Sequence, residues 1–66
     1  MNNTKRIVIK GSEAFRHAGY SCFVYQLESG KWAGNVDGCE RTQDFDTRDQ
    51  AIAATKEDAE WIESVV

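Results

Sequence analysis

The last third of the chain reads DTRDQAIAATKEDAEWIESVV, from Asp46 to Val66, and predicts one long amphipathic helix. Thr47 and Gln50 match a capping box, in which the Thr47 hydroxyl accepts from the Gln50 amide and the Gln50 side chain reaches back to the Thr47 amide. A helix is therefore expected over residues 47–65. At about 100° per residue, the apolar positions fall on one broad half of it. That half holds Ala51, Ile52, Ala54, Thr55, Asp58, Ala59, Trp61, Ile62, Val65 and Val66.

Two members of the apolar half are polar. Thr55 can bond a carbonyl oxygen one turn back along the helix. Asp58 needs a partner if it is buried, because an unpaired buried carboxylate is costly. We expect Asp58 either in a salt bridge or at the rim of the helix near Trp61, and its role stays open.

The size and charge of the chain limit the classes of function. The chain has 66 residues, a formal net charge of −3 and a pI near 4.9. A core of this size stabilises a fold only modestly, so dimerisation or a bound partner would be a natural supplement. The acidic charge argues against direct nucleic-acid binding through phosphate contacts. With no membrane-length apolar run and no signal-peptide pattern, no membrane association and a cytoplasmic location are expected.

Short strands are expected ahead of the helix, in a single small domain covering residues 1–66. We predict them at about residues 5–10, 20–28, 31–36 and 39–45. Ser12–Gly19 is left open as a loop or one helical turn. The fold class is α+β, an antiparallel β-meander of three to four strands with one C-terminal α-helix packed across one face.

Two turns set the expected register of this sheet. Ser29-Gly30 reads as a two-residue hairpin loop and Asp37-Gly38 as a type I′ turn. With these loops, Cys39 lies on the core face and Cys22 on the opposite face, which argues against a disulfide between them. The predicted core face holds Phe23, Tyr25, Leu27, Trp32, Gly34, Val36 and Phe45, and the outer face Tyr20, Cys22, Val24 and Ala33.

No residue pattern points to catalysis. His17 is the one histidine of the chain and has no nucleophile pattern around it, although a general base must be positioned against a second group. The two cysteines do not have metal-ligand spacing. Gly30, Gly34 and Gly38 lack the strand-to-helix context of a phosphate loop. We therefore expect no enzyme activity, no metal and no cofactor.

Two surfaces are candidates for partner binding. The first is the acidic face of the helix with the neighbouring aromatic residue, and its ordinary interpretation is a solvated face. The second is the outer sheet face, more apolar than a wetted face requires, although isolated exposed apolar residues are normal. The candidate residues are Asp49, Glu57, Glu60, Glu63 and Trp61 on the helix and Tyr20 and Val24 on the sheet.

Part of the chain resembles the amino-terminal domain of HicB-type antitoxins. The residues that carry the resemblance are Gly38-Cys39, Thr42, Asp46-Thr47, Ala51 and Glu57-Asp58-Ala59. The resemblance implies a small sheet with a helix on one face and a protein that neutralises an RNA-cleaving toxin. Trp32 and Phe45-Asp46-Thr47 are also similar to small uncharacterised bacterial and phage domains built of a sheet followed by one helix.

The leading hypothesis is a non-catalytic protein-interaction module, antitoxin-like, that binds a protein partner. The alternative is a small acidic inhibitor whose helix carboxylates mimic nucleic acid on a basic target surface, with strongly salt-sensitive binding. A third class, a small enzyme or ligand carrier, would need a pocket. Docking through the outer sheet face would also allow a homodimer.

Overall fold

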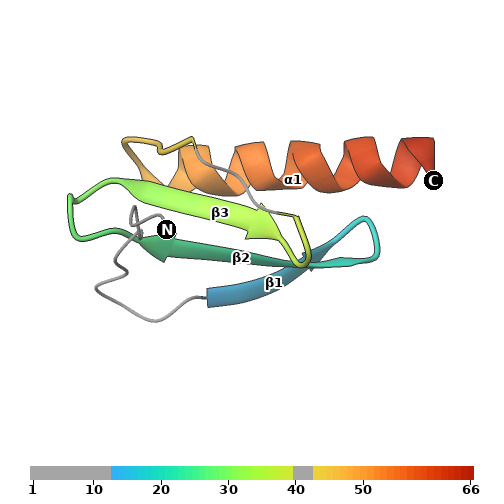
Figure 1. Cartoon of the computed structure of the whole chain (residues 1–66), viewed down its shortest axis with the longest axis horizontal. Coiled ribbons are helices and arrows are strands. Elements are labelled where there is room, and N and C mark those ends of the chain that lie inside the picture. The colour runs from blue at the N-terminus through green and yellow to red at the C-terminus, as the bar shows by residue number, and fades with distance from the viewer. Residues whose placement is uncertain (1–12, 40–42) are drawn as a thin grey trace, which may run out of the picture.

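The computed structural model describes residues 13–39 and 43–66. Its three strands form one antiparallel sheet in the order β1-β2-β3, and one helix, α1, lies along the sheet (Figure 1). The predicted α+β fold with a C-terminal helix on one face is thus confirmed, and the strand predicted at 5–10 lies outside the described residues. The elements are β1 Glu13–His17, β2 Tyr20–Gln26, β3 Trp32–Val36 and α1 Arg48–Val65.

The helix starts where the capping box predicts. Thr47 is the N-cap residue, and its hydroxyl accepts from the Gln50 amide at 3.1 Å. The Gln50 side-chain oxygen in turn accepts from the amides of Thr47 at 3.2 Å and Asp46 at 3.1 Å. One side chain thus satisfies two amides at the helix start. Within the described residues, no helix has both the length and the apolar character needed to cross a membrane.

The segment left open as a loop or helical turn is mostly a strand. Residues 13–17 form β1, and His17 pairs with Tyr20 across the two-residue loop Ala18-Gly19. Both loop residues have positive φ, 54° at Ala18 and 84° at Gly19, as a type I′ turn requires. Ala18-Gly19 carries no turn signal in the sequence, because alanine is an unusual residue at positive φ.

The loop between β2 and β3 is one residue longer than predicted. The Leu27 amide donates to the Lys31 carbonyl at 2.8 Å, and the Gly30 amide donates to the Leu27 carbonyl at 2.9 Å. Residues 28–30 therefore form a three-residue loop that ends on Gly30 at φ 94°. The register changes by one residue, so Gly34 pairs with Val24 instead of Tyr25.

This one-residue shift exchanges the two faces of β2 relative to the prediction, because side chains alternate between the faces of a strand. Cys22 and Val24 are buried on the helix side, and Phe23 and Tyr25 are only half-buried on the other face. The predicted core face was wrong for β2 and right for β3, where Val36 is buried in the core.

The candidate binding residues on the sheet change place for the same reason. Val24 is buried beneath α1, and half-buried Tyr20 packs against the core cluster of Cys22, Val36 and Ala59. Tyr20 and Val24 therefore do not form an outer docking face.

The strand predicted over 39–45 is reduced to one β-bridge in the described part of that range. Phe45 and Trp32 exchange two backbone hydrogen bonds of 2.7 Å each, and Gln43 and Asp44 belong to no strand. The turn before this segment has positive φ only at Gly38, so it is not type I′. Cys39 is exposed where a core position was predicted, Cys22 is fully buried where the outer face was predicted, and both are free thiols.

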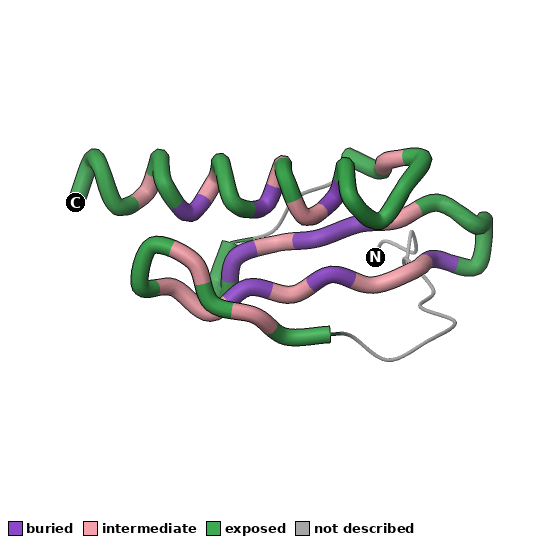
Figure 2. The backbone as a smooth tube through the Cα atoms, turned by 180° about the vertical axis from the view of Figure 1, so that it is seen from behind, coloured by how far each residue is buried: buried purple, intermediate pink, exposed green. Residues whose placement is uncertain are grey.

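The helix approaches the sheet closely at Gly34. A Cβ atom built on Gly34 would lie 2.3 Å from Thr55 Oγ1 and 2.9 Å from the Phe23 carbonyl oxygen. The residues that α1 buries are equally small, namely Ala51, Thr55 and Ala59. As predicted, the Thr55 hydroxyl donates one turn back, to the Ala51 carbonyl at 2.8 Å. Figure 2 shows the buried residues gathered where α1 faces the sheet.

Candidate functional site

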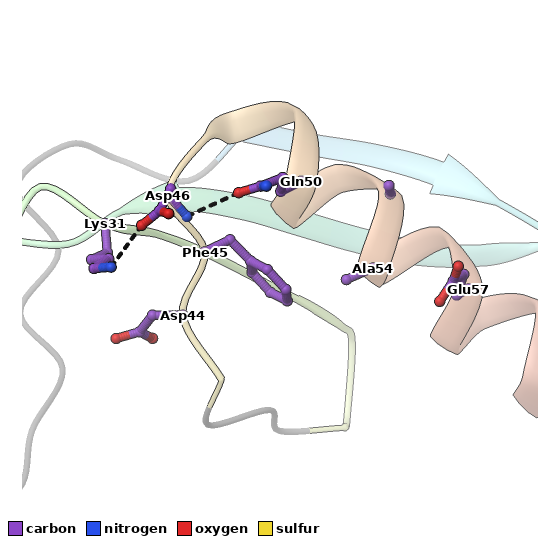
Figure 3. A pocket seen from close by; sticks show the side chains of 8 residues that line it. Lys31, Asp44, Phe45, Asp46, Gln50, Ala54 and Glu57 are labelled. Atoms are coloured by element: carbon purple, nitrogen blue, oxygen red, sulfur yellow. Dashed lines mark hydrogen bonds and ion pairs between the residues drawn. The ribbon is translucent and has the colours of Figure 1, made fainter.

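An open hollow lies between the start of α1 and the segment that precedes it. We call it the Phe45 groove; it is open and measures about 490 Å³. Figure 3 shows the Phe45 ring directed toward Ala54 on the helix, with Asp44 on the segment that precedes α1 and Glu57 on the helix. Its lining residues are Lys31, Asp44, Phe45, Asp46, Gln50, Ala53, Ala54 and Glu57.

The groove follows from the local structure on both of its sides. The double hydrogen bond between Phe45 and Trp32 fixes the aromatic wall to the edge of β3. On the helix side, Ala53 and Ala54 carry only methyl groups, so the space above them stays open. The capping box holds the helix start against this wall, because Gln50 bonds the backbone of Asp46.

Among the described residues that line the groove, negative charge predominates. Three of them are carboxylates and one is an ammonium, that of Lys31, whose Nζ lies 2.6 Å from Asp46 Oδ1. The hydrogen bond and charge of Asp46 raise the pKa of Lys31 above its ordinary value. The same contact with Lys31 lowers the pKa of Asp46. Both groups therefore stay charged across the neutral pH range.

The side of α1 that borders the groove continues to an exposed tryptophan. Gln50, Ala54, Glu57 and Trp61 follow one another at helical spacings of four, three and four residues and so share one side. Trp61 is 66% exposed, although the sequence placed it on the apolar half. An apolar cleft of about 210 Å³ lies beside it, lined by Cys39, Asp58, Trp61 and Ile62.

Asp58 lies at the rim of the core, which is one of its two predicted places. Its side chain is half-buried and borders the cleft beside Trp61.

The structure separates the predicted helix residues into two groups. Glu57 and Trp61 lie on the groove side of α1. By helical spacing, Asp49, Glu60 and Glu63 lie on the flank that turns toward β1, and all three are exposed. On that flank, His17 Nε2 contacts Glu60 Oε2 at 2.6 Å, so Glu60 links the helix to the end of β1.

The sequence did not identify Asp44, Phe45 and Lys31 as site residues. Phe45 was expected to pack under the helix as the end of a full strand. The Lys31–Asp46 pair joins residues 15 positions apart, so its formation depends on the path of the chain between them.

Groups with chemical reactivity are sparse in the described residues. Burial raises the pKa of the Cys22 thiol, which keeps it in the protonated, weakly nucleophilic form. No group of three or more histidine, cysteine, aspartate or glutamate side chains in residues 13–39 and 43–66 could hold a metal ion. The groove itself offers carboxylates, an ammonium, an amide and apolar surface, which suit non-covalent contacts.

No protein-family model matches the chain, and no curated protein or solved structure is similar enough to count as a match.

Proposed function

We propose that the chain is a non-catalytic protein-interaction module that binds a basic segment of a partner protein. The observation that carries the proposal is the position of Trp61 on the same side of α1 as the Phe45 groove. Together they form one docking surface with an aromatic anchor at one end and a carboxylate-lined groove at the other. Neutralising a partner by sequestration, as the resemblance to HicB-type antitoxins implies, is one form of this function.

Trp61 supports the proposal through its exposure. An indole ring buries a large apolar area when a partner covers it, and tryptophan is enriched among the residues that dominate binding energy. Val65, one helical turn after Trp61, is 59% exposed and adds apolar surface beside the indole ring. A chain of this size has few large apolar side chains, so leaving one in solvent is a cost that partner binding would offset.

The composition of the groove supports a basic segment as the occupant. A lysine or arginine stem can lie along Ala53, Ala54 and the Phe45 ring while its charged group lies near the carboxylates. Complementary charge across an interface favours the correct partner and speeds encounter. The groove and Trp61 therefore select for a partner that combines cationic and apolar side chains.

One experiment tests this assignment with a matched control. The chain is used to capture proteins from the lysate of its native host, and affinity for the captured protein is then measured by calorimetry. We expect Glu57→Lys and Trp61→Ala each to weaken binding at least tenfold. Glu63→Lys makes the same charge change on the other flank of α1 and should leave affinity within about twofold. Equal losses for Glu57→Lys and Glu63→Lys would contradict a groove-centred surface.

The acidic-inhibitor hypothesis remains the second candidate, because Asp49, Glu57, Glu60 and Glu63 are all exposed along α1. It predicts that the double variant Glu60→Gln/Glu63→Gln loses affinity and that binding weakens steeply with added salt. The groove assignment predicts nearly unchanged affinity for this double variant. A circular-dichroism spectrum of the variant checks that its fold is intact, since Glu60 also contacts His17.

A further inference from the structure

β1 forms an edge of the sheet, and the described residues place no strand on its far side. Along an antiparallel strand, the amide and carbonyl groups of successive residues point alternately toward the paired strand and away from it. His17 and Tyr20 close the two-residue hairpin, so the amide and carbonyl groups of Glu13, Phe15 and His17 point toward β2. The amide and carbonyl groups of Ala14 and Arg16 consequently point away from the sheet.

The sequence of this edge is complementary to itself. When two copies of β1 lie antiparallel with Phe15 opposite Phe15, the outward groups of Ala14 in one copy meet those of Arg16 in the other. The same register sets Glu13 opposite His17 of the second copy, on the face that carries α1. The Glu13 carboxylate, which pairs with Arg48 of its own chain, then faces the His17 imidazole of the second copy, which contacts its own Glu60. Two aromatic rings meet at the two-fold axis.

The structure leaves room for the second copy's side chains beside this edge. A groove of about 310 Å³ lies between β1 and α1. It is lined by half-buried Phe15 and Ile52, by Ala14 and by the charged residues Glu13, Arg16, Arg48 and Lys56. Residues 13–17 are at most half-buried, in contrast to the neighbouring part of β2 (Figure 2). In the paired arrangement, the Phe15 ring of a second copy would meet Phe15 beside this groove.

The charged residue that normally blocks such an edge is turned away from it. Edge strands commonly carry an outward lysine or arginine that discourages pairing. The Arg16 guanidinium instead donates to the Gly19 carbonyl at 2.9 Å and to Ser21 Oγ at 3.1 Å. These contacts hold the guanidinium over the β1–β2 hairpin, so it does not block pairing at the outward backbone groups of Ala14 and Arg16.

The geometry points to a symmetric homodimer in which β1 pairs antiparallel with β1 of a second copy about Phe15, joining the two sheets into one. The occupant of this edge is thus a second copy of the chain, distinct from the partner at the Phe45 groove. Five residues from each copy make a small contact, so the dimer is weak and depends on concentration.

The test measures molecular mass by sedimentation over a hundredfold range of concentration, together with amide exchange at Ala14 and Arg16 by nuclear magnetic resonance. We expect the wild-type mass to rise toward that of a dimer, with exchange of these two amides slowing at least tenfold in parallel. Ala14→Pro removes one outward donor and no bond to β2, so it should remain monomeric. Glu28→Pro, in the exposed β2–β3 loop, is the matched control and should dimerise like wild type.

Two results would overturn the dimer. One is a wild-type mass that stays monomeric throughout. The other is amide exchange at Ala14 and Arg16 that is slow at every concentration, which would mean that this chain's own residues cover the edge; the sequence predicts a strand at 5–10 that could do so. If Ala14→Pro does not fold, the concentration dependence of wild-type exchange still decides between these outcomes.

Discussion

The two halves of α1 use their side chains in opposite ways. The first half is fixed by the capping box at Thr47 and by small residues that bring Thr55 against Gly34. The second half turns Ala59 and Ile62 inward but leaves Trp61 and Val65 mostly in solvent. The comparison teaches that the first half of α1 packs on the sheet through small groups, whereas the second half leaves two large apolar side chains, Trp61 and Val65, exposed.

The largest expected effect is at the contact in the first half. Gly34→Ala should lower the free energy of unfolding by roughly 2–3 kcal/mol, because the new methyl group meets Thr55 Oγ1 and the Phe23 carbonyl oxygen. Urea denaturation monitored by circular dichroism measures the loss. Adding Thr55→Ala to Gly34→Ala should recover part of it, since the Oγ1 overlap disappears.

Gly38→Ala separates packing from backbone strain in that measurement. Gly38 has φ 87°, and no atom lies within 4 Å of the position that a Cβ would take there. Gly38→Ala should therefore lower the free energy of unfolding by about 1–2 kcal/mol through the left-handed backbone alone. Thr55→Ala should restore none of that loss. An equal recovery in both backgrounds would show that Thr55 does not act through the Gly34 contact.

The next effect is at the helix start. Thr47→Ala removes the acceptor for the Gln50 amide and should cost about 1 kcal/mol. Thr47→Ser keeps the hydroxyl and should cost clearly less, which makes it the control. Thermal unfolding of the two variants measures the difference, and equal losses would mean that the capping hydrogen bond does not secure this half of α1.

In the second half, replacing an exposed side chain should hardly change the fold. Trp61→Ser is expected to shift the free energy of unfolding by no more than about 0.5 kcal/mol, since the ring is 66% exposed. Ile62→Ser is the contrasting variant, because Ile62 packs against the core, and it should destabilise clearly more. A large loss for Trp61→Ser in chemical denaturation would contradict the contrast between the two halves.

The smallest effect is at the Lys31–Asp46 pair beside the first half, because both side chains are mostly exposed. Its contribution is present above the ordinary pKa of Asp46 and lost as pH falls through the lowered folded value. It is also present below the ordinary pKa of Lys31 and lost as pH rises through the raised folded value. Asp46→Asn should therefore reduce the melting temperature slightly at neutral pH and low salt.

High salt and acid provide the controls for this variant. At 1 M salt the Debye length falls to about 3 Å, and the difference between Asp46→Asn and wild type should shrink. It should also vanish in acid, where Asp46 is protonated in the wild type. A difference that stays constant with salt and pH would assign the effect to something other than this ion pair.

Much of the fold could be predicted because its signals are local. Strand-forming residues bounded by turn signals predicted β2 and β3, and the helix spacing together with the cap predicted α1. Of the candidate site, Glu57 and Trp61 were identified from the helix pattern alone. Asp44, Phe45 and Lys31 were missed because their place in the groove depends on how the chain returns to Trp32.

The sequence by itself determined α1 and its starting residue, because the capping box is satisfied entirely within Thr47–Gln50. Only the tertiary structure decided which face of β2 packs beneath the helix. Ser29-Gly30 is compatible with a two-residue or a three-residue loop, and one added residue reverses every side chain of a strand. The observed register pairs Val24 with Gly34 and sets Gly34 against Ala51 and Thr55, a contact between distant segments that no local pattern specifies.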